Sequence, residues 1–252
     1  MNFIKEFLYC DLEIAEEIYD YFKEQHDFVE IPCGKTFLIE KFKEEKEFLV
    51  FHSVYGRRVN DVLSRAYAYA AARLRHRDVE IGISDNGFFL AAEKLDEKKI
   101  IEFVKSATVE EILREAIEKT DILKRRFRHC AGRALMILKN YKGIEKSVGR
   151  QQVHSEFLYV AVRKISAEFP ILREARREVM EDLMDITSAK QVLRWIEKGE
   201  IKIKVAQVPI VSPFGLHLIM RGRSDLIKME DKINFVRRMH ELHMKVIAGK
   251  KE

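Results

Sequence analysis

Two short motifs carry residue types that could do chemistry, but each lacks part of the pattern that its chemistry needs. The segment CGKT at residues 33–36 resembles the end of a phosphate-binding loop, yet the pattern G-x-x-x-x-G-K-[ST] requires glycine where Val29 stands. His240 and His243 have the i, i+3 spacing of metal ligands on a helix, without an H-E-x-x-H motif or a partnering carboxylate cluster. We therefore predict neither an ATP site nor a metal site from these residues, and we expect that the chain is not an enzyme on its own.

Clustered cations are a stronger chemical signal than these motifs. The net charge is +5, but residues 1–50 carry 6 basic and 13 acidic residues, whereas residues 121–178 carry 14 basic and 6 acidic residues. A second basic block, residues 51–78, carries 6 basic and 2 acidic residues. Arginine is frequent in both basic blocks, and its planar guanidinium suits the paired oxygens of a phosphate. The blocks favour phosphate binding, with solvated charged faces as the alternative.

The most informative basic segment is an expected helix over residues 121–140. One polar arc of this helix contains Arg125, Arg128, Gly132 and Lys139, while Arg126 and Arg133 flank the core on the other side. Gly132 costs the helix about 1 kcal/mol of propensity. It would either let a phosphodiester backbone approach closely or allow tight helix packing, and the sequence leaves both interpretations open.

The segment that follows, YKGIEKSVGRQQ, is expected to be an exposed loop that adds further cations and two amides. These residues are Lys142, Lys146, Arg150, Gln151 and Gln152. Cations bind the backbone of a nucleic acid without regard to sequence and in a salt-sensitive way, and amides can bond to sugar or phosphate. The segment therefore extends the candidate surface of the preceding helix.

Hydrophobic periodicity predicts an α+β fold that would position these residues. Helices are expected over residues 11–25, 56–75, 96–106, 109–118, 121–140, 151–167, 170–184, 188–198 and 224–248. Strands are expected over residues 36–42, 47–52, 79–84 and 88–93, with later strands in IKIKVAQV and LHLIM. The dipeptide Asn86-Gly87 is a strong hairpin signal between the third and fourth strands. The prediction is an antiparallel sheet built mainly from the N-terminal half, packed with a predominantly helical C-terminal half.

Composition excludes several classes of protein. Of 252 residues, 47% are hydrophobic and 35% are charged, which is too apolar for a disordered chain, and 11 Gly with 4 Pro are too few for collagen. Apolar runs fall short of a membrane span, and acidic residues stand near the start where a signal peptide would need its apolar core. Three widely spaced cysteines favour a reducing compartment. We expect a soluble, cytoplasmic protein without a membrane partner.

Four long blocks together resemble one known family. In order they are FHSVYGRRVNDVLSRAYAYAAARL, EIGISDNGFFL, FRHCAGRALMILKNYKGIEKSVGRQQ and FPILREARREVMEDLMDITSAKQVLRWIEKGEI. They are similar to the C-terminal accessory region, the DEAD/H associated domain, of archaeal Lhr-type superfamily 2 helicases, and the similarity runs from about residue 25 to about residue 225. The resemblance implies that residues 26–252 form a single α+β domain, β-rich over 26–93 and helical over 94–252. It also implies that residues 1–25 are a leading helix, interpreted as a remnant of a winged helix.

The resemblance further implies a non-catalytic module that grips single-stranded DNA or RNA for an ATP-dependent helicase. The family's motor motifs are missing from this sequence, so ATP and Mg²⁺ would be bound by motor domains and no cofactor is expected here. The resemblance places contacts with the nucleic acid, or within the fold, only at positions in 56–60, 125–129 and 146–152. Together with the charge pattern, it gives these candidate nucleic-acid-binding residues: Arg57, Arg58, Asn60, Arg65, Arg125, Arg126, Arg128, Arg133, Lys139, Lys142, Lys146, Arg150, Gln151 and Gln152.

Two other functions remain open at this stage. In one, the chain is a structural scaffold that docks onto helicase motor domains, or onto a separate motor subunit, and touches no nucleic acid. In the other, it is an enzyme such as a nuclease or glycosylase, which would need converging carboxylates or a metal cluster.

Overall fold

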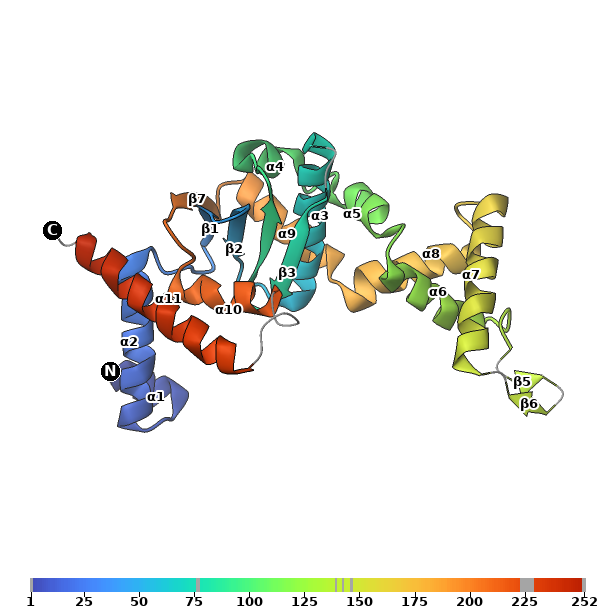
Figure 1. Cartoon of the computed structure of the whole chain (residues 1–252). Helices are drawn as coiled ribbons and strands as arrows, with labels where there is room; N and C mark the ends of the chain where they lie inside the picture. Colours follow the sequence, from blue (N-terminus) through green and yellow to red (C-terminus); the bar gives the residue numbers. More distant parts are fainter. Residues whose placement is uncertain are drawn as a thin grey trace.

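The computed structural model describes residues 2–75, 78–138, 140–141, 143–145, 147–222 and 229–250. Figure 1 shows a sheet covered by helices and, beside it, a helical arm that contains α6, α7 and α8. The predicted α+β class is confirmed, with the sheet drawn mainly from the N-terminal half of the chain. Within the described residues, we find no helix that is both long and apolar enough to cross a membrane.

The central sheet has five strands in the order β3-β4-β2-β1-β7. The strands are β1 (Thr36–Lys43), β2 (Glu47–His52), β3 (Glu80–Ser84), β4 (Gly87–Ala92) and β7 (Lys202–Gln207). The first four pair antiparallel as predicted, and the tight turn before Gly87 joins β3 to β4. The strand predicted in IKIKVAQV is β7, which pairs parallel with β1 after the long helical excursion, so the sheet is mixed.

Helices cover both faces of this sheet, which explains why β2 and β4 are buried along nearly their whole length. On one face Phe51 and Phe88 stack against Tyr67 of α3 (Arg57–Arg75), with ring centroids 5.3 and 6.1 Å from that of Tyr67. The same core includes α4 (Glu97–Phe103), α5 (Val109–Ile117) and α9 (Ile186–Glu197). On the opposite face, Val50 and Phe89 pack in a second core that α2 (Leu12–Phe28), α10 (Pro213–Gly222) and α11 (Met229–Gly249) complete.

The helical arm consists of α6 (Asp121–Arg133), α7 (Val148–Ile165) and α8 (Pro170–Arg177). Phe127 of α6 meets Tyr159 of α7 edge-on, with ring centroids 5.2 Å apart, and Leu172 of α8 is fully buried. A π-helical segment, η1 (Glu178–Leu183), continues α8 towards the sheet. Two short strands, β5 (Asn140–Tyr141) and β6 (Ile144–Glu145), lie between α6 and α7, and α1 (Asn2–Leu8) precedes α2.

Arg58 ties the arm to the sheet. Its Nη2 atom donates to the backbone carbonyls of Glu181, at 2.6 Å, and Met184, at 3.0 Å, at the end of η1. The backbone NH of Asp185 in turn donates to the carbonyl of Arg58 at 3.3 Å. Carbonyls at the end of a helix lack intrahelical donors, so the guanidinium satisfies groups that would otherwise be unpaired.

Three sequence predictions of secondary structure are corrected, two of them helix boundaries. The helix expected over 121–140 ends at Arg133, because Leu135 has a φ of +58° and the NH of Met136 bonds back to the carbonyl of Ala131. The helix expected from residue 151 begins at Val148, with the Ser147 hydroxyl accepting from the NH of Arg150 at 3.5 Å.

The third correction concerns LHLIM, which was expected to be a strand and lies in α10 instead. Pro213 stands at the first position of this helix, where its fixed φ is favourable and its missing NH has no intrahelical role. The Ser212 hydroxyl accepts from the NH of Gly215 at 3.2 Å, which satisfies an early helix donor. These local contacts outweigh the apolar run that suggested a strand.

Candidate nucleic-acid interface

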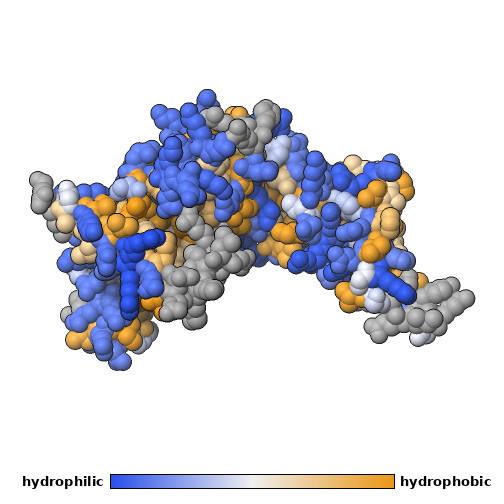
Figure 2. Space-filling view, in the orientation of Figure 1, coloured by the Kyte–Doolittle hydropathy of each residue, from blue (hydrophilic) through white to orange (hydrophobic). Residues whose placement is uncertain are grey.

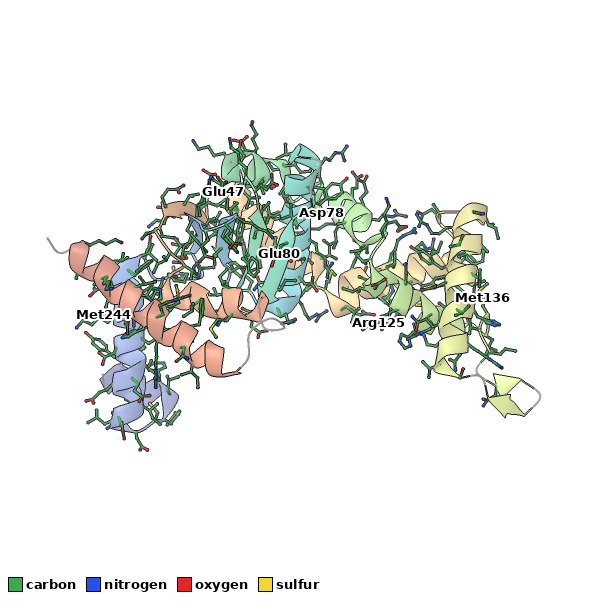
Figure 3. All side chains as sticks on the ribbon, in the orientation of Figure 1. Glu47, Asp78, Glu80, Arg125, Met136 and Met244 are labelled. Atoms are coloured by element: carbon green, nitrogen blue, oxygen red, sulfur yellow. The ribbon has the colours of Figure 1, made fainter. Side chains whose placement is uncertain are left out.

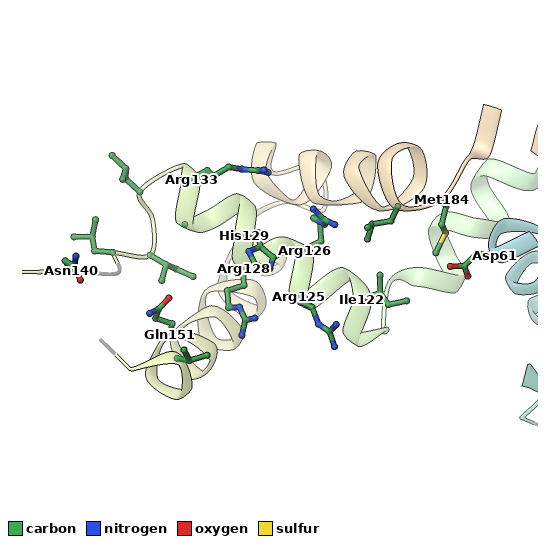
Figure 4. Close-up of a pocket in the computed structure, with 16 residues that line it drawn as sticks. Asp61, Ile122, Arg125, Arg126, Arg128, His129, Arg133, Asn140, Gln151 and Met184 are labelled. Carbon is green, nitrogen blue, oxygen red and sulfur yellow. The ribbon is translucent and has the colours of Figure 1, made fainter. Parts of the chain in front are cut away.

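Arg125 and Arg128 lie one turn apart on α6 and line a hollow of about 1010 Å³ on the arm. Gln151, on the first turns of α7, lines the same hollow. Figure 4 shows that Arg125 and Arg128 point away from α8, with Arg128 directed towards Gln151, and Figure 3 places Arg125 at the outside of the arm. Within the part of the chain that the structure describes, neither arginine has a carboxylate partner. Their charges are therefore available to an external anion.

Arg126 and Arg133 lie on the same helix but face α8 and η1. The Nη1 atom of Arg126 is 3.3 Å from Oε2 of Glu178, and Nη2 of Arg133 bonds to Oε1 of the same carboxylate. Glu178 is only 4% exposed, and its hydrogen bond raises the pKa of the Arg133 guanidinium. Two of the predicted contacts with a nucleic acid thus neutralise a buried carboxylate of the fold.

A second hollow, of about 390 Å³, also borders on Arg125 and Arg128. Both hollows are lined by these two arginines and by Val148, which together form the ridge between them. Gln152 lines the second hollow, whereas Gln151 lines the first, so the two glutamines reach different hollows. Arg150 is exposed on the first turn of α7 and, among the described residues, forms no ion pair.

The basic block at residues 51–78 is used mostly inside the fold. Asn60 is fully buried, and its amide nitrogen donates to the carbonyls of Ser53 at 2.9 Å and of Ser84 and Asp85, both at 3.0 Å. The hydroxyl of Ser53 donates to its amide oxygen at 2.6 Å. This side chain joins the end of β2 to the β3–β4 turn. Its buried amide is therefore not accessible to a nucleic-acid strand.

The three arginines of that block that were predicted as contacts divide between structural and exposed roles. Arg65 pairs with Asp61 one turn earlier on α3, at 2.7 Å, and Arg58 holds the end of η1 as described above. Arg57 is exposed and donates to the carbonyl of Ile83 at 3.4 Å. It lies on the sheet part of the molecule and does not line either hollow of the arm.

Lys139, Lys142 and Lys146 lie outside the described residues, so their part in the site stays a prediction. Gly132 can be placed: it lines the larger hollow, and a Cβ added to it would have no described atom within 4 Å. Tight helix packing therefore does not explain this glycine. The other interpretation of Gly132, the close approach of a phosphodiester backbone, stays a prediction.

Sequence reasoning missed two residues that shape this site. Glu178 decides which arginines of α6 are neutralised, and its only sequence signal is an acidic residue within a strongly basic block. Val148 contributes to the ridge, although the sequence predicts a loop there; in the structure α7 begins at this residue, with Ser147 as its N-cap.

The two histidines considered as metal ligands serve the fold. Nε2 of the buried His243 is 2.7 Å from the carbonyl oxygen of Val211, and its Nδ1 is 3.4 Å from Glu24, which also lies 3.2 Å from His240. These contacts join α11 to α2 and to the segment that precedes α10. Among the residues described, His, Cys, Asp and Glu form no group of three that could hold a metal ion.

The architecture defines a class before any particular family: a mixed sheet covered by helices on both faces, carrying a basic helical arm. The chain belongs to the DEAD/H associated family, whose profile matches residues 31–215. It is 48% identical over 244 residues to the ATP-dependent helicase Lhr-Core of Methanothermobacter thermautotrophicus. The aligned region covers 96% of this chain and 28% of that relative. The match to the ATP-dependent helicase Lhr-Core of Saccharolobus solfataricus is 38% identical and covers 92% of this chain and 27% of the relative.

A solved structure has the same fold. The helicase Lhr of Mycobacterium smegmatis, bound to ssDNA and AMP-PNP, superposes with a TM-score of 0.72 at 24% identity, over 81% of this chain and 27% of that one. The chain thus spans between a quarter and a third of the length of these helicases. The suspected relationship to Lhr-type helicases is confirmed at the level of the family.

Proposed function

We propose that this chain is the accessory module of an Lhr-like ATP-dependent helicase and that it grips single-stranded DNA or RNA through phosphate contacts. The observation that carries the proposal is the contrast along α6. Arg126 and Arg133 share the buried carboxylate of Glu178, whereas Arg125 and Arg128 face a hollow without a carboxylate partner among the described residues. Unpaired, partly exposed guanidinium groups on a concave surface attract phosphate.

In this proposal, ATP hydrolysis takes place in a part of the helicase outside this sequence. The sequence lacks the G-x-x-x-x-G-K-[ST] loop, so ATP and Mg²⁺ would be bound by the motor portion of a longer or associated protein. In this proposal the module, residues 26–252, holds the strand in the cytoplasm while another part of the helicase moves it. It needs no cofactor of its own for that task.

A salt titration tests the proposal. Fluorescence anisotropy with a labelled single strand should give a log affinity that falls linearly with log salt, because binding releases counterions from the strand. Absence of binding at about 50 mM salt, where phosphate contacts are strong, would contradict it.

One observation favours a second candidate, a scaffold that docks onto helicase motor domains. Figure 2 shows apolar side chains at the surface of the arm near α7. Val153, Phe157 and Val160 follow one face of that helix and are 51%, 74% and 52% exposed. Contiguous exposed apolar side chains often mark a protein interface.

A pull-down with a motor that lacks this region distinguishes the two candidates. The scaffold predicts that the chain captures the motor, that Phe157→Ser abolishes this capture, and that the chain binds no single strand. The nucleic-acid module predicts that strand binding persists in the absence of any motor. Capture of the motor without strand binding would favour the scaffold alone.

A further inference from the structure

The two hollows beside the Arg125–Arg128 ridge differ in chemical character. The larger hollow, of about 1010 Å³, includes the aliphatic side chains of Ile122, Ile137, Leu138 and Val148. The smaller, of about 390 Å³, has a polar lining that includes Ser155, Glu156 and Tyr159. Sites for small ligands commonly occupy about 300–1,000 Å³, so both hollows are large enough for a bound group.

The apolar lining is not needed to bind a phosphate. Leu138 is 37% exposed and Val148 is 70% exposed, although both lie at a surface dominated by cations. Apolar side chains beside cations match a ligand that is itself divided into an apolar part and an anionic part. A nucleotide of a single strand has that composition, since its base presents two apolar faces while its phosphate is charged.

The two glutamines supply the polar groups that a base edge requires. Gln151 lines the apolar hollow, and Gln152 lines the polar one. Successive residues of a helix point about 100° apart, which is why neighbouring residues of α7 reach different hollows. An amide carries both donors and an acceptor, so it can bond to the edge of any base.

We propose that the larger hollow is a nucleobase pocket: phosphates lie on Arg125 and Arg128, and an unstacked base enters the hollow against Leu138 and Val148, with its edge towards Gln151. This inference rests on the proposed function, because the phosphate grip brings the strand to the ridge. It adds that the module contacts bases as well as backbone. The Gly132 position, open above the same hollow, gives the strand room to approach.

A comparison with abasic DNA separates the contribution of the bases to the binding affinity from that of the phosphates. The test compares a labelled oligothymidylate with a strand of equal length and phosphate number that carries abasic sites throughout, both titrated with the 252-residue chain. A base pocket predicts that the abasic strand binds about five-fold more weakly at the same salt concentration, since contacts to a base face contribute a part of the affinity that phosphates do not supply.

Paired variants locate the effect. Leu138→Ser with Val148→Ser should bring binding of the intact strand down to the abasic level. The control, Val153→Ser with Val160→Ser, alters two exposed residues of α7 that do not line the hollow and should retain the full difference. Thermal unfolding checks that both double variants are folded.

The outcomes also distinguish this inference from the proposed function. Equal affinities for intact and abasic strands, with the same salt slope, would overturn the base pocket while the phosphate grip stands. Loss of the difference in the control variant would overturn it as well. Failure of both strands to bind would overturn the proposed function itself, and the pocket with it.

Discussion

Nη1 of Arg126 lies 3.3 Å from Oε2 of Glu178, a carboxylate that is almost completely buried at the start of η1. Arg125, the preceding residue, points in a different direction and lines the hollow of the arm (Figure 4). Two adjacent arginines of one basic block therefore have separate tasks. One neutralises a charge of the fold, and the other is available to a ligand.

This division predicts different stabilities for two equivalent substitutions. Among the described residues, Arg126→Gln leaves Glu178 with a single cationic partner, the exposed Arg133, and should lower the free energy of unfolding by about 1–3 kcal/mol. Arg125→Gln removes an exposed charge and should change it by less than about 0.5 kcal/mol. Urea denaturation followed by circular dichroism measures both. Equal stabilities for the two variants would show that Glu178 does not depend on Arg126.

Asn60 should act on stability and not on strand binding. Asn60→Ala removes the donors to three backbone carbonyls and the acceptor for the hydroxyl of Ser53, all in a buried site. Buried groups left without partners cost about 1–3 kcal/mol each, so we expect a loss of at least about 2 kcal/mol in urea denaturation. At a temperature where the variant is folded, its strand affinity should match that of the unaltered chain. A stable variant with weakened binding would instead place Asn60 at the interface.

The Glu40–His52 pair predicts part of the acid sensitivity of the fold. Burial raises the pKa of Glu40, but the hydrogen bond and charge of His52, at 2.6 Å, and the NH of Ser212, at 3.0 Å, outweigh it and hold the pKa below the ordinary value of 4.5. A carboxyl whose pKa is lowered in the folded state stabilises that state above its unfolded pKa. The contribution is lost as the pH falls through the folded pKa.

Glu40→Gln provides the measurement for this pair. Thermal unfolding between pH 7 and pH 3 should show a smaller loss of stability below about pH 4.5 in the variant than in the unaltered chain. Some acid sensitivity should remain, because Lys41 also lowers the pKa of Glu97. Identical pH profiles for the two proteins would contradict the role assigned to Glu40.

Local signals explain what the sequence could predict of the fold. The β3–β4 hairpin and the apolar runs of β2 and β4 follow from turn chemistry and periodicity, and they lie where expected. The two turn residues are Asp85 and Asn86, however, because Gly87 already belongs to β4 and pairs with Ser84. The end of α6 could not be predicted, because the left-handed residue there is Leu135 and no glycine or asparagine marks it. Likewise, alternation identified β7 as a strand but carried no information about its parallel pairing with β1.

The candidate site was predictable to a similar extent. Helical spacing alone separated the arc of Arg125 and Arg128 from that of Arg126 and Arg133, and the structure keeps this separation. The identity of the partner could not be read from spacing, because Glu178 lies 45 residues beyond Arg133 in a π-helical segment. Arg58 and Asn60 illustrate the same limit, since their partners are backbone carbonyls that only the tertiary fold brings together.

The salt dependence of strand binding by Arg125→Gln with Arg128→Gln tests the central claim most directly. Each phosphate contact on a single strand contributes about 0.7 to the slope of log affinity against log salt, so the double variant should lose about 1.4 of that slope. The control, Arg126→Gln, should keep the full slope when measured in its folded state. An unchanged slope and affinity in the double variant would contradict the account, because the ridge would then not be where the phosphates bind.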